Sequence, residues 1–351
     1  MLAMFALIAA GCGDDSGDSD DNDDAAPTTL PGADDDPADD EIPDETLVVY
    51  SGRSEELVGP LLEQFTADTG IAVEVRYGDT AQMASLILTE GDNSPADVYY
   101  GQDAGALGAL SNAGRLAELD QGILDLVPEG LRSPDGTWVG TSGRARVVVY
   151  NTEALTEADL PASILDFTDP KWSGRMGWAP TNGSFQAFVT ALRLVEGEDG
   201  ARAWLEGIMA NDPVTYDNNI AIVEAVAAGE VEVGFVNHYY LQRFLAEDPD
   251  FTAANYFFPS DDPGGLVNVA GAGIVDTSDD AELATNLIEY LLSYEAQMYF
   301  SGETFEIPLV ADVDPAEGVP SLADINVPDI DLGAIDDLEG TLALLTDVGA
   351  L

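Results

Sequence analysis

Apolar residues in the first third of the chain change their spacing in a regular way. Short continuous runs predict strands, and apolar positions three or four residues apart predict helices. The predicted strands are Thr46–Tyr50, Ile71–Val75 and Ala96–Tyr100, and the predicted helices are Ser54–Thr69, Thr80–Glu90 and Asp103–Ala113. This alternation with short connections predicts a parallel sheet with helices on both faces.

The pattern changes at Arg144–Asn151, whose continuous apolar run is typical of a fully buried or crossing strand. A second run rich in Val and Gly, Leu266–Val275, is expected to cross back beside it. The remaining predicted helices are Ser184–Val195, Ala201–Ala210, Asn219–Ala228, Ala281–Leu292 and Tyr294–Phe300, and the remaining strands are Val214–Tyr216 and Val231–Asn237.

These elements predict two α/β lobes joined by two crossing strands, with a ligand cleft between the lobes. We assign residues 46–145 plus about 264–315 to an N-lobe, and residues 146–263 plus about 316–351 to a C-lobe. Ligands of open α/β sheets lie outside the carboxyl ends of strands. Three loops that follow predicted strands are expected to meet there: Ser51–Arg53, Gln102–Asp103 and Tyr239–Tyr240.

The N-terminal residues indicate export and a lipid anchor. Met1–Ala10 is apolar but too short to span a bilayer, and fits the core of a secretory signal. Small residues before Cys12 resemble a lipobox, so residues 1–12 are interpreted as a lipoprotein signal peptide. The usual basic segment is missing, so either the start codon lies further upstream or the signal is atypical. Residues 13–45 carry 15 acidic and no basic residues, which predicts a disordered acidic tether.

Charge excludes several classes of partner. The chain has 67 acidic and 11 basic residues and a formal net charge of −56. Such a charge argues against nucleic acid and against anionic membrane surfaces, and leaves the lipid as the only expected link to a membrane. It suits solubility at high salt, where self-repulsion is screened. Cys12 is the only cysteine, so the body is expected to fold without disulfides. We expect a monomer at the cell surface or in the periplasm.

Metal-binding chemistry in this chain rests mainly on oxygen atoms, because His238 is its only histidine. Tyr239 and Tyr240 stand together after the strand predicted at Val231–Asn237. Most tyrosines simply pack, and Tyr99–Tyr100 forms a second such pair. The alternative is that two phenols at a strand end bind a hard, highly charged cation. Alternation along a strand would point His238 away from Tyr239.

Six short motifs occur in an order that resembles the ferric-iron-binding proteins of bacterial ABC importers. They are Tyr50–Arg53, Ser94–Tyr99, Ser142–Tyr150, Pro170–Trp172, Asn237–Tyr240 and Pro263–Val267. The resemblance runs from about Leu47 to the end of the chain. It implies a type II periplasmic-binding fold, in which each lobe is a mixed sheet flanked by helices.

The resemblance also implies which residues bind the metal. Tyr239 and Tyr240 match the paired tyrosine ligands of the family, and a bound Fe(III) lets a phenol with a pKa near ~10 coordinate as phenolate at neutral pH. Gln102 stands where the family has a glutamate, and is a weaker ligand; whether its neighbour Asp103 approaches the metal instead is open. Arg53 or Ser54 stands where some members have a histidine.

An anion such as carbonate, phosphate or citrate is therefore expected to complete the coordination. The residues that match the family's anion contacts are Asn182, Gly183, Ser184, Asn219 and Asn237. Arg53 and Arg144 lie in motif loops and could hold the anion through two hydrogen bonds each. Asn182 and Asn219 could equally be helix N-caps, and Arg144 could equally form a salt bridge.

Three functions remain to be compared. The leading one is a lipid-anchored solute-binding protein that captures ferric iron for an ABC permease without catalysis. The second keeps the fold but binds a ferric chelate or another small anionic solute. The third, an extracellular hydrolase, is disfavoured because one histidine and one N-terminal cysteine leave few ways to assemble a nucleophilic triad.

Overall fold

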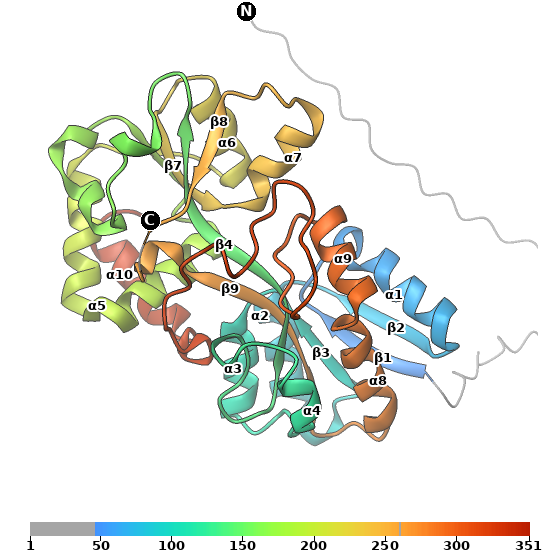
Figure 1. The fold of residues 1–351 in the computed structure, drawn as a ribbon. Coiled ribbons are helices and arrows are strands. Elements are labelled where there is room, and N and C mark those ends of the chain that lie inside the picture. Colours follow the sequence, from blue (N-terminus) through green and yellow to red (C-terminus); the bar gives the residue numbers. More distant parts are fainter. Residues whose placement is uncertain (1–45, 260) are drawn as a thin grey trace, which may run out of the picture. The chain divides into compact units, whose positions relative to one another are not determined.

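The computed structural model describes residues 46–259 and 261–351 (Figure 1). The predicted signal peptide with Cys12 and the predicted tether lie outside the described residues. Within them, no helix combines the length and the apolar character that a bilayer crossing requires.

Nine strands of the described residues form one mixed sheet, in the order β2-β1-β3-β9-β4-β7-β5-β6, with β8 beside β4. Their bounds are β1 Thr46–Ser51, β2 Ala72–Tyr77, β3 Val98–Gly101, β4 Val139–Asn151, β5 Met176–Trp178, β6 Val214–Thr215, β7 Val233–Asn237, β8 Ala253–Tyr256 and β9 Val267–Ile274. The parallel order predicted for the first three strands is confirmed, since β1 pairs in parallel with β2 and β3. The sheet as a whole is not parallel, because β9 runs antiparallel to both β3 and β4.

Strand β4 belongs to two parts of this sheet. Its residues Val139–Ala145 pair with β9, and its residues Arg146–Asn151 pair with β7 and β8. We call β2, β1, β3 and β9 the first half of the sheet, and β7, β5, β6 and β8 the second half. Figure 1 shows β4 and β9 side by side where the halves meet. All residues of β4 are buried, which explains its continuous apolar run. The division of the chain into two lobes stays a prediction.

The helices are α1 Glu55–Thr69, α2 Thr80–Glu90, α3 Ala104–Asn112, α4 Gln121–Leu124, α5 Gly183–Ala210, α6 Asn219–Ala227, α7 Tyr239–Glu247, α8 Ala281–Leu291, α9 Tyr294–Glu303 and α10 Leu338–Asp347. The two helices predicted between Ser184 and Ala210 are confirmed, since the span labelled α5 is broken into two helices at Gly197, where φ is 74°. Glycine is the residue that tolerates this conformation without a Cβ clash. The sequence patterns did not predict β5, β8, α4, α7 or α10.

One prediction near the tyrosine pair is wrong. Strand β7 ends at Asn237 as predicted, but His238 already has helical backbone angles, and Tyr239 and Tyr240 open helix α7. The alternation argument for His238 therefore does not apply.

The C-terminal residues contact helices of both predicted lobes. A short 3-10 turn, η7 (Leu332–Ala334), packs on α3, where a Cβ on Gly108 would collide with the carbonyl oxygen of Gly333. Helix α10 packs on α5, where the hydroxyls of Thr190 and Thr341 lie 2.7 Å apart. We call residues 332–347 the C-terminal strap. This segment was assigned in full to the C-lobe, yet it also rests on α3, which belongs to the predicted N-lobe.

Candidate metal and anion site

Tyr239 and Tyr240 lie in the first turn of α7 with their ring centroids 4.2 Å apart. The N-terminal end of a helix carries unpaired N–H groups and a partial positive charge, which stabilise a nearby anion. Placement in the first turn of a helix therefore favours the phenolate form more than the expected strand end would. Burial raises the pKa of Tyr239, and the neighbouring Tyr240 raises it further, so the metal-free phenol is protonated at neutral pH. A bound cation has to displace that proton.

His238 is held by the backbone. The amide of Ala145 donates to its Nδ1 at 3.1 Å, so Nε2 carries the proton and donates to the carbonyl oxygen of Phe305 at 2.9 Å. Burial lowers the pKa of His238 to about 4, which keeps the imidazole neutral. Both ring nitrogens are thus occupied by main-chain groups, and His238 ties the start of α7 to β4 and to the segment after α9.

Two arginines that were not singled out from the sequence lie near the tyrosines. The guanidinium carbon of Arg243 lies 5.5 Å from the Tyr239 ring centroid and 5.8 Å from that of Tyr240, and the buried Arg146 interacts electrostatically with both phenols. The Nη1 atom of Arg146 donates to Ser184 Oγ and to Asn237 Oδ1, both at 3.1 Å. No carboxylate of the described residues lies within 4.0 Å of its side chain. Burial lowers the pKa of Arg146 to about 10, while Tyr240 and Tyr239 act in the opposite direction, so the guanidinium remains charged at neutral pH. A buried, unpaired cation of this kind attracts an anion.

The predicted anion residues surround Arg146. Asn182 is the N-cap of α5 and accepts from the Ser184 amide at 3.0 Å, as the capping alternative expected. Asn219 is not a cap, because Asn218 caps α6. Instead, its Nδ2 donates to Asn182 Oδ1 at 3.1 Å. Ser184 and Asn237 accept hydrogen bonds from Arg146, so four of the predicted anion residues belong to one network. Gly183 lines a cavity beside this network.

Arg53 has contacts of a different kind. Its Nη2 lies 2.6 Å from Glu306 Oε2, and its Nη1 donates to Ser142 at 2.9 Å and Tyr100 at 3.4 Å. Burial opposes both charges, but the ion pair outweighs it, so the pKa of Arg53 is raised and that of Glu306 is lowered. These contacts give no support to the prediction that Arg53 holds an anion.

Arg144 forms the salt bridge that was its alternative role, with Nε 3.7 Å from Glu306 Oε1. Its Nη2 also donates to the carbonyl oxygen of Gln102. Glu306 therefore lies between Arg53 and Arg144, and was missed because its partners are far away in the sequence.

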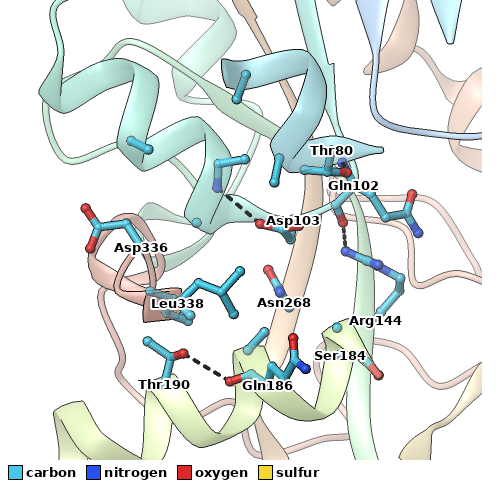
Figure 2. A pocket seen from close by; sticks show the side chains of 18 of the residues that line it. Thr80, Gln102, Asp103, Arg144, Ser184, Gln186, Thr190, Asn268, Asp336 and Leu338 are labelled. Atoms are coloured by element: carbon cyan, nitrogen blue, oxygen red, sulfur yellow. Dashed lines mark hydrogen bonds between the residues drawn. The ribbon is translucent and has the colours of Figure 1, made fainter. Parts of the chain in front are cut away.

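A cavity of about 410 Å³ adjoins Arg146 (Figure 2). Its polar lining includes Gln102, Arg144, Arg146, Ser184, Asn237 and Asn268. The Oε1 atom of Gln102 is buried without a hydrogen-bond partner, whereas Asp103 is engaged as the cap of α3, accepting from Ala106 at 3.1 Å. The two tyrosines do not line this cavity, and Arg146 and Asn237 connect them to it.

No three His, Cys, Asp or Glu side chains in the described part of the chain gather as a metal-ion cluster.

Comparison with known proteins gives consistent similarities. A family model described as a bacterial extracellular solute-binding protein matches residues 93–332. The Fe(3+)-binding periplasmic protein of Serratia marcescens is 31% identical over 311 residues, covering 88% of this chain and 91% of that protein. The structure of iron-bound HitA from Pseudomonas aeruginosa has 34% identity and a TM-score of 0.78, covering 87% of this chain and 99% of that one. The IdiA (FutA) protein of Trichodesmium, in complex with iron and citrate ligands, has 30% identity and the same TM-score and coverage.

Proposed function

Since this chain belongs to the bacterial extracellular solute-binding proteins, we propose that it captures ferric iron with an anion and delivers it to an ABC importer. The relatives are solute-binding proteins and not enzymes, so binding and release are its whole activity. Attachment to the membrane through a lipid on Cys12 and the residue 13–45 tether is part of the same proposal.

The observation that carries the proposal is the placement of Tyr239 and Tyr240 at a helix N-terminus beside Arg146. Loss of two phenolic protons supplies two negative charges to a trivalent ion, and the dipole of α7 stabilises them. The charge that remains on the metal, together with Arg146, attracts an anion.

The anion is proposed to bind between Arg146 and the N-terminus of α5. Ser184 and Asn237 orient the guanidinium, and Gly183, the first residue of α5, lines the adjoining cavity, where a helix N-terminus favours an anion. Carbonate, phosphate and citrate all have oxygens that can bridge a guanidinium and a metal. Gln102, with an unpartnered Oε1 in the adjoining cavity, is proposed as a weak further ligand.

The test is a ferric titration of the metal-free protein that follows the tyrosinate-to-iron charge-transfer band. Wild type is expected to develop the band, and Tyr239→Phe and Tyr240→Phe are each expected to weaken iron binding at least about tenfold, because each removes an anionic ligand.

Tyr294→Phe is the matched control, since Tyr294 is 55% exposed at the start of α9. Absence of the band in wild type, or its survival unchanged in both single variants, would falsify the ferric-tyrosinate site.

A further inference from the structure

The cavity beside Arg146 has two chemically different ends. Arg144, Arg146 and Gln102 lie at the polar end. The other end is lined mainly by small and aliphatic side chains from α2, α3, α5 and the C-terminal strap, namely Ala84, Leu88, Ala106, Ala109, Ala187 and Leu338. Three polar side chains, Gln186, Thr190 and Asp336, lie beside Leu338 at this end. Figure 2 shows Arg144 and Leu338 on opposite sides, with Asn268 between them.

The size of the cavity exceeds what a metal ion with a small anion needs. At about 410 Å³ it falls within the range of about 300–1,000 Å³ that is typical of sites for organic ligands. Carbonate or phosphate at Arg146 would leave the apolar end empty. The cavity therefore fits a larger solute that is polar at one end only.

The polar end contains arginines without full ionic partners, and the carboxylate that lines it, that of Asp103, already accepts from the amide of Ala106. Arg146 has no carboxylate within 4.0 Å among the described residues, and Arg144 shares Glu306 with Arg53. The buried Nε of Arg144 and the buried Oε1 of Gln102 have no hydrogen-bond partner. A ligand with several carboxylates and a hydroxyl group would satisfy these groups together.

The apolar end is incompletely covered. Leu88 on α2 is 44% exposed and Leu338 on the strap is 41% exposed, and both border the cavity. An apolar group bound between them would remove both side chains from water. Helices α2 and α3 on one side and α5 on the other provide the alanine surface against which it would pack.

From these features we infer that the solute is a ferric chelate whose ligand joins a polycarboxylate head to an apolar chain or ring. The head and metal lie at Arg146 and the tyrosines, and the apolar part lies between α3, α5 and Leu338. This inference rests on the proposed ferric site and specifies the class of chelator that it takes.

The experiment compares ferric citrate with the ferric complex of a citrate that carries a hexyl chain, by isothermal titration of the metal-free protein. Both ligands keep the same carboxylates and hydroxyl, so they differ only in apolar surface. The hexyl complex is expected to bind about tenfold or more tightly, since each buried methylene strengthens binding.

Two variants locate the effect. Leu88→Ser with Leu338→Ser removes exposed apolar surface at the rim, and Ala106→Phe fills the cavity. Both are expected to abolish the preference for the hexyl complex, so that the two ferric complexes bind with equal affinity. Ala281→Phe, at an exposed position in α8, is the control and is expected to keep the preference.

Each alternative result has a distinct meaning. Equal or weaker binding of the hexyl complex by wild type overturns the inference and leaves the proposed ferric function intact. Binding of ferric ion with carbonate alone has the same two consequences. Equal binding of the iron-free hexyl citrate also overturns it, because the solute would then be the carboxylate itself. If no ferric complex binds under any condition, the proposed function fails as well.

Discussion

At the scale of single residues, the charge of Arg146 has a larger role in the candidate site than the sequence indicated. Arg144 and Arg146 are two residues apart on β4, so they face the same side of the strand. Glu306 lies near Arg144 but not near Arg146, so the two arginines have different electrostatic roles. Arg144 shares Glu306 with Arg53, whereas Arg146 has no carboxylate partner among the described residues and is left to meet a ligand.

This difference predicts the behaviour of Arg146→Gln. The variant should lose the anion dependence of iron binding, with a drop in affinity of about tenfold or more in the presence of phosphate or citrate, because one charge-assisted contact contributes about 1.5–3 kcal/mol. Calorimetric titration with and without each anion measures it. Arg202→Gln, which removes an exposed pair with Asp347, should behave as wild type. Retention of the full anion effect by Arg146→Gln would remove this residue from the site.

His238 predicts a pH dependence of stability in the metal-free protein. Its pKa is lowered to about 4 in the fold, so between this value and the ordinary value of about 6.5 the unfolded chain binds more protons. The unfolding free energy should therefore fall as pH falls, by about 2 kcal/mol from about pH 7 to about pH 5.

Urea unfolding at several pH values, compared between wild type and His238→Gln, isolates this contribution, because His238 is the only histidine. The two proteins should differ in slope over this interval. Parallel curves would mean that the imidazole is not buried as described.

Sequence reasoning at this scale found the candidates that a motif contains and missed those that folding brings together. Tyr239, Tyr240 and five anion residues came from a resemblance, and four of the five share one hydrogen-bond network with Arg146. Glu306 could not be found, because 67 acidic residues give no contrast and Arg53 lies 253 positions away.

At the scale of secondary structure, long elements with a clear period were predicted well. Helix α2 begins and ends where predicted, and β9 lies within its predicted range. The failures are short or lie at a change of structure. Strand β5 has three residues, too few for a period, and the passage from β7 to α7 carries apolar residues that fit either element.

The contact between α3 and the C-terminal strap can be tested through Gly108. A Cβ at this position would collide with the carbonyl oxygen of Gly333, a backbone atom that no change of side-chain rotamer can move away. Gly108→Ala is expected to lower the unfolding free energy by about 1–3 kcal/mol and to weaken solute binding, since Leu338 of the strap borders the cavity.

Gly122→Ala is the matched control, because nothing lies within 4 Å of the added atom and the glycine is helical. Urea denaturation gives the stability, and the ferric titration gives the binding. Equal unfolding free energies for Gly108→Ala and Gly122→Ala would show that the C-terminal strap does not pack closely on α3.

At the scale of the whole molecule, the fold class followed from the alternation of elements and from the resemblance, and it is confirmed. The chain has the fold of type II periplasmic-binding proteins, as its structural neighbours do. The net charge of −56 contributes little to this result, since surface charge affects solubility and association more than topology. The candidate site differs from the strongly negative chain as a whole, because it contains more arginines than buried carboxylates.

The place of β9 in the sheet has a consequence for how the protein is made. Strand β3 ends at Gly101, but its neighbour β9 begins only at Val267. The first part of β4 also pairs with β9. A ribosome must therefore complete most of the chain before the first half of the sheet can close. Long-range pairing of this kind slows folding and leaves strand edges exposed in the meantime. The newly made chain should thus remain in an unfolded, transportable form for longer than a protein whose neighbouring strands follow one another in sequence.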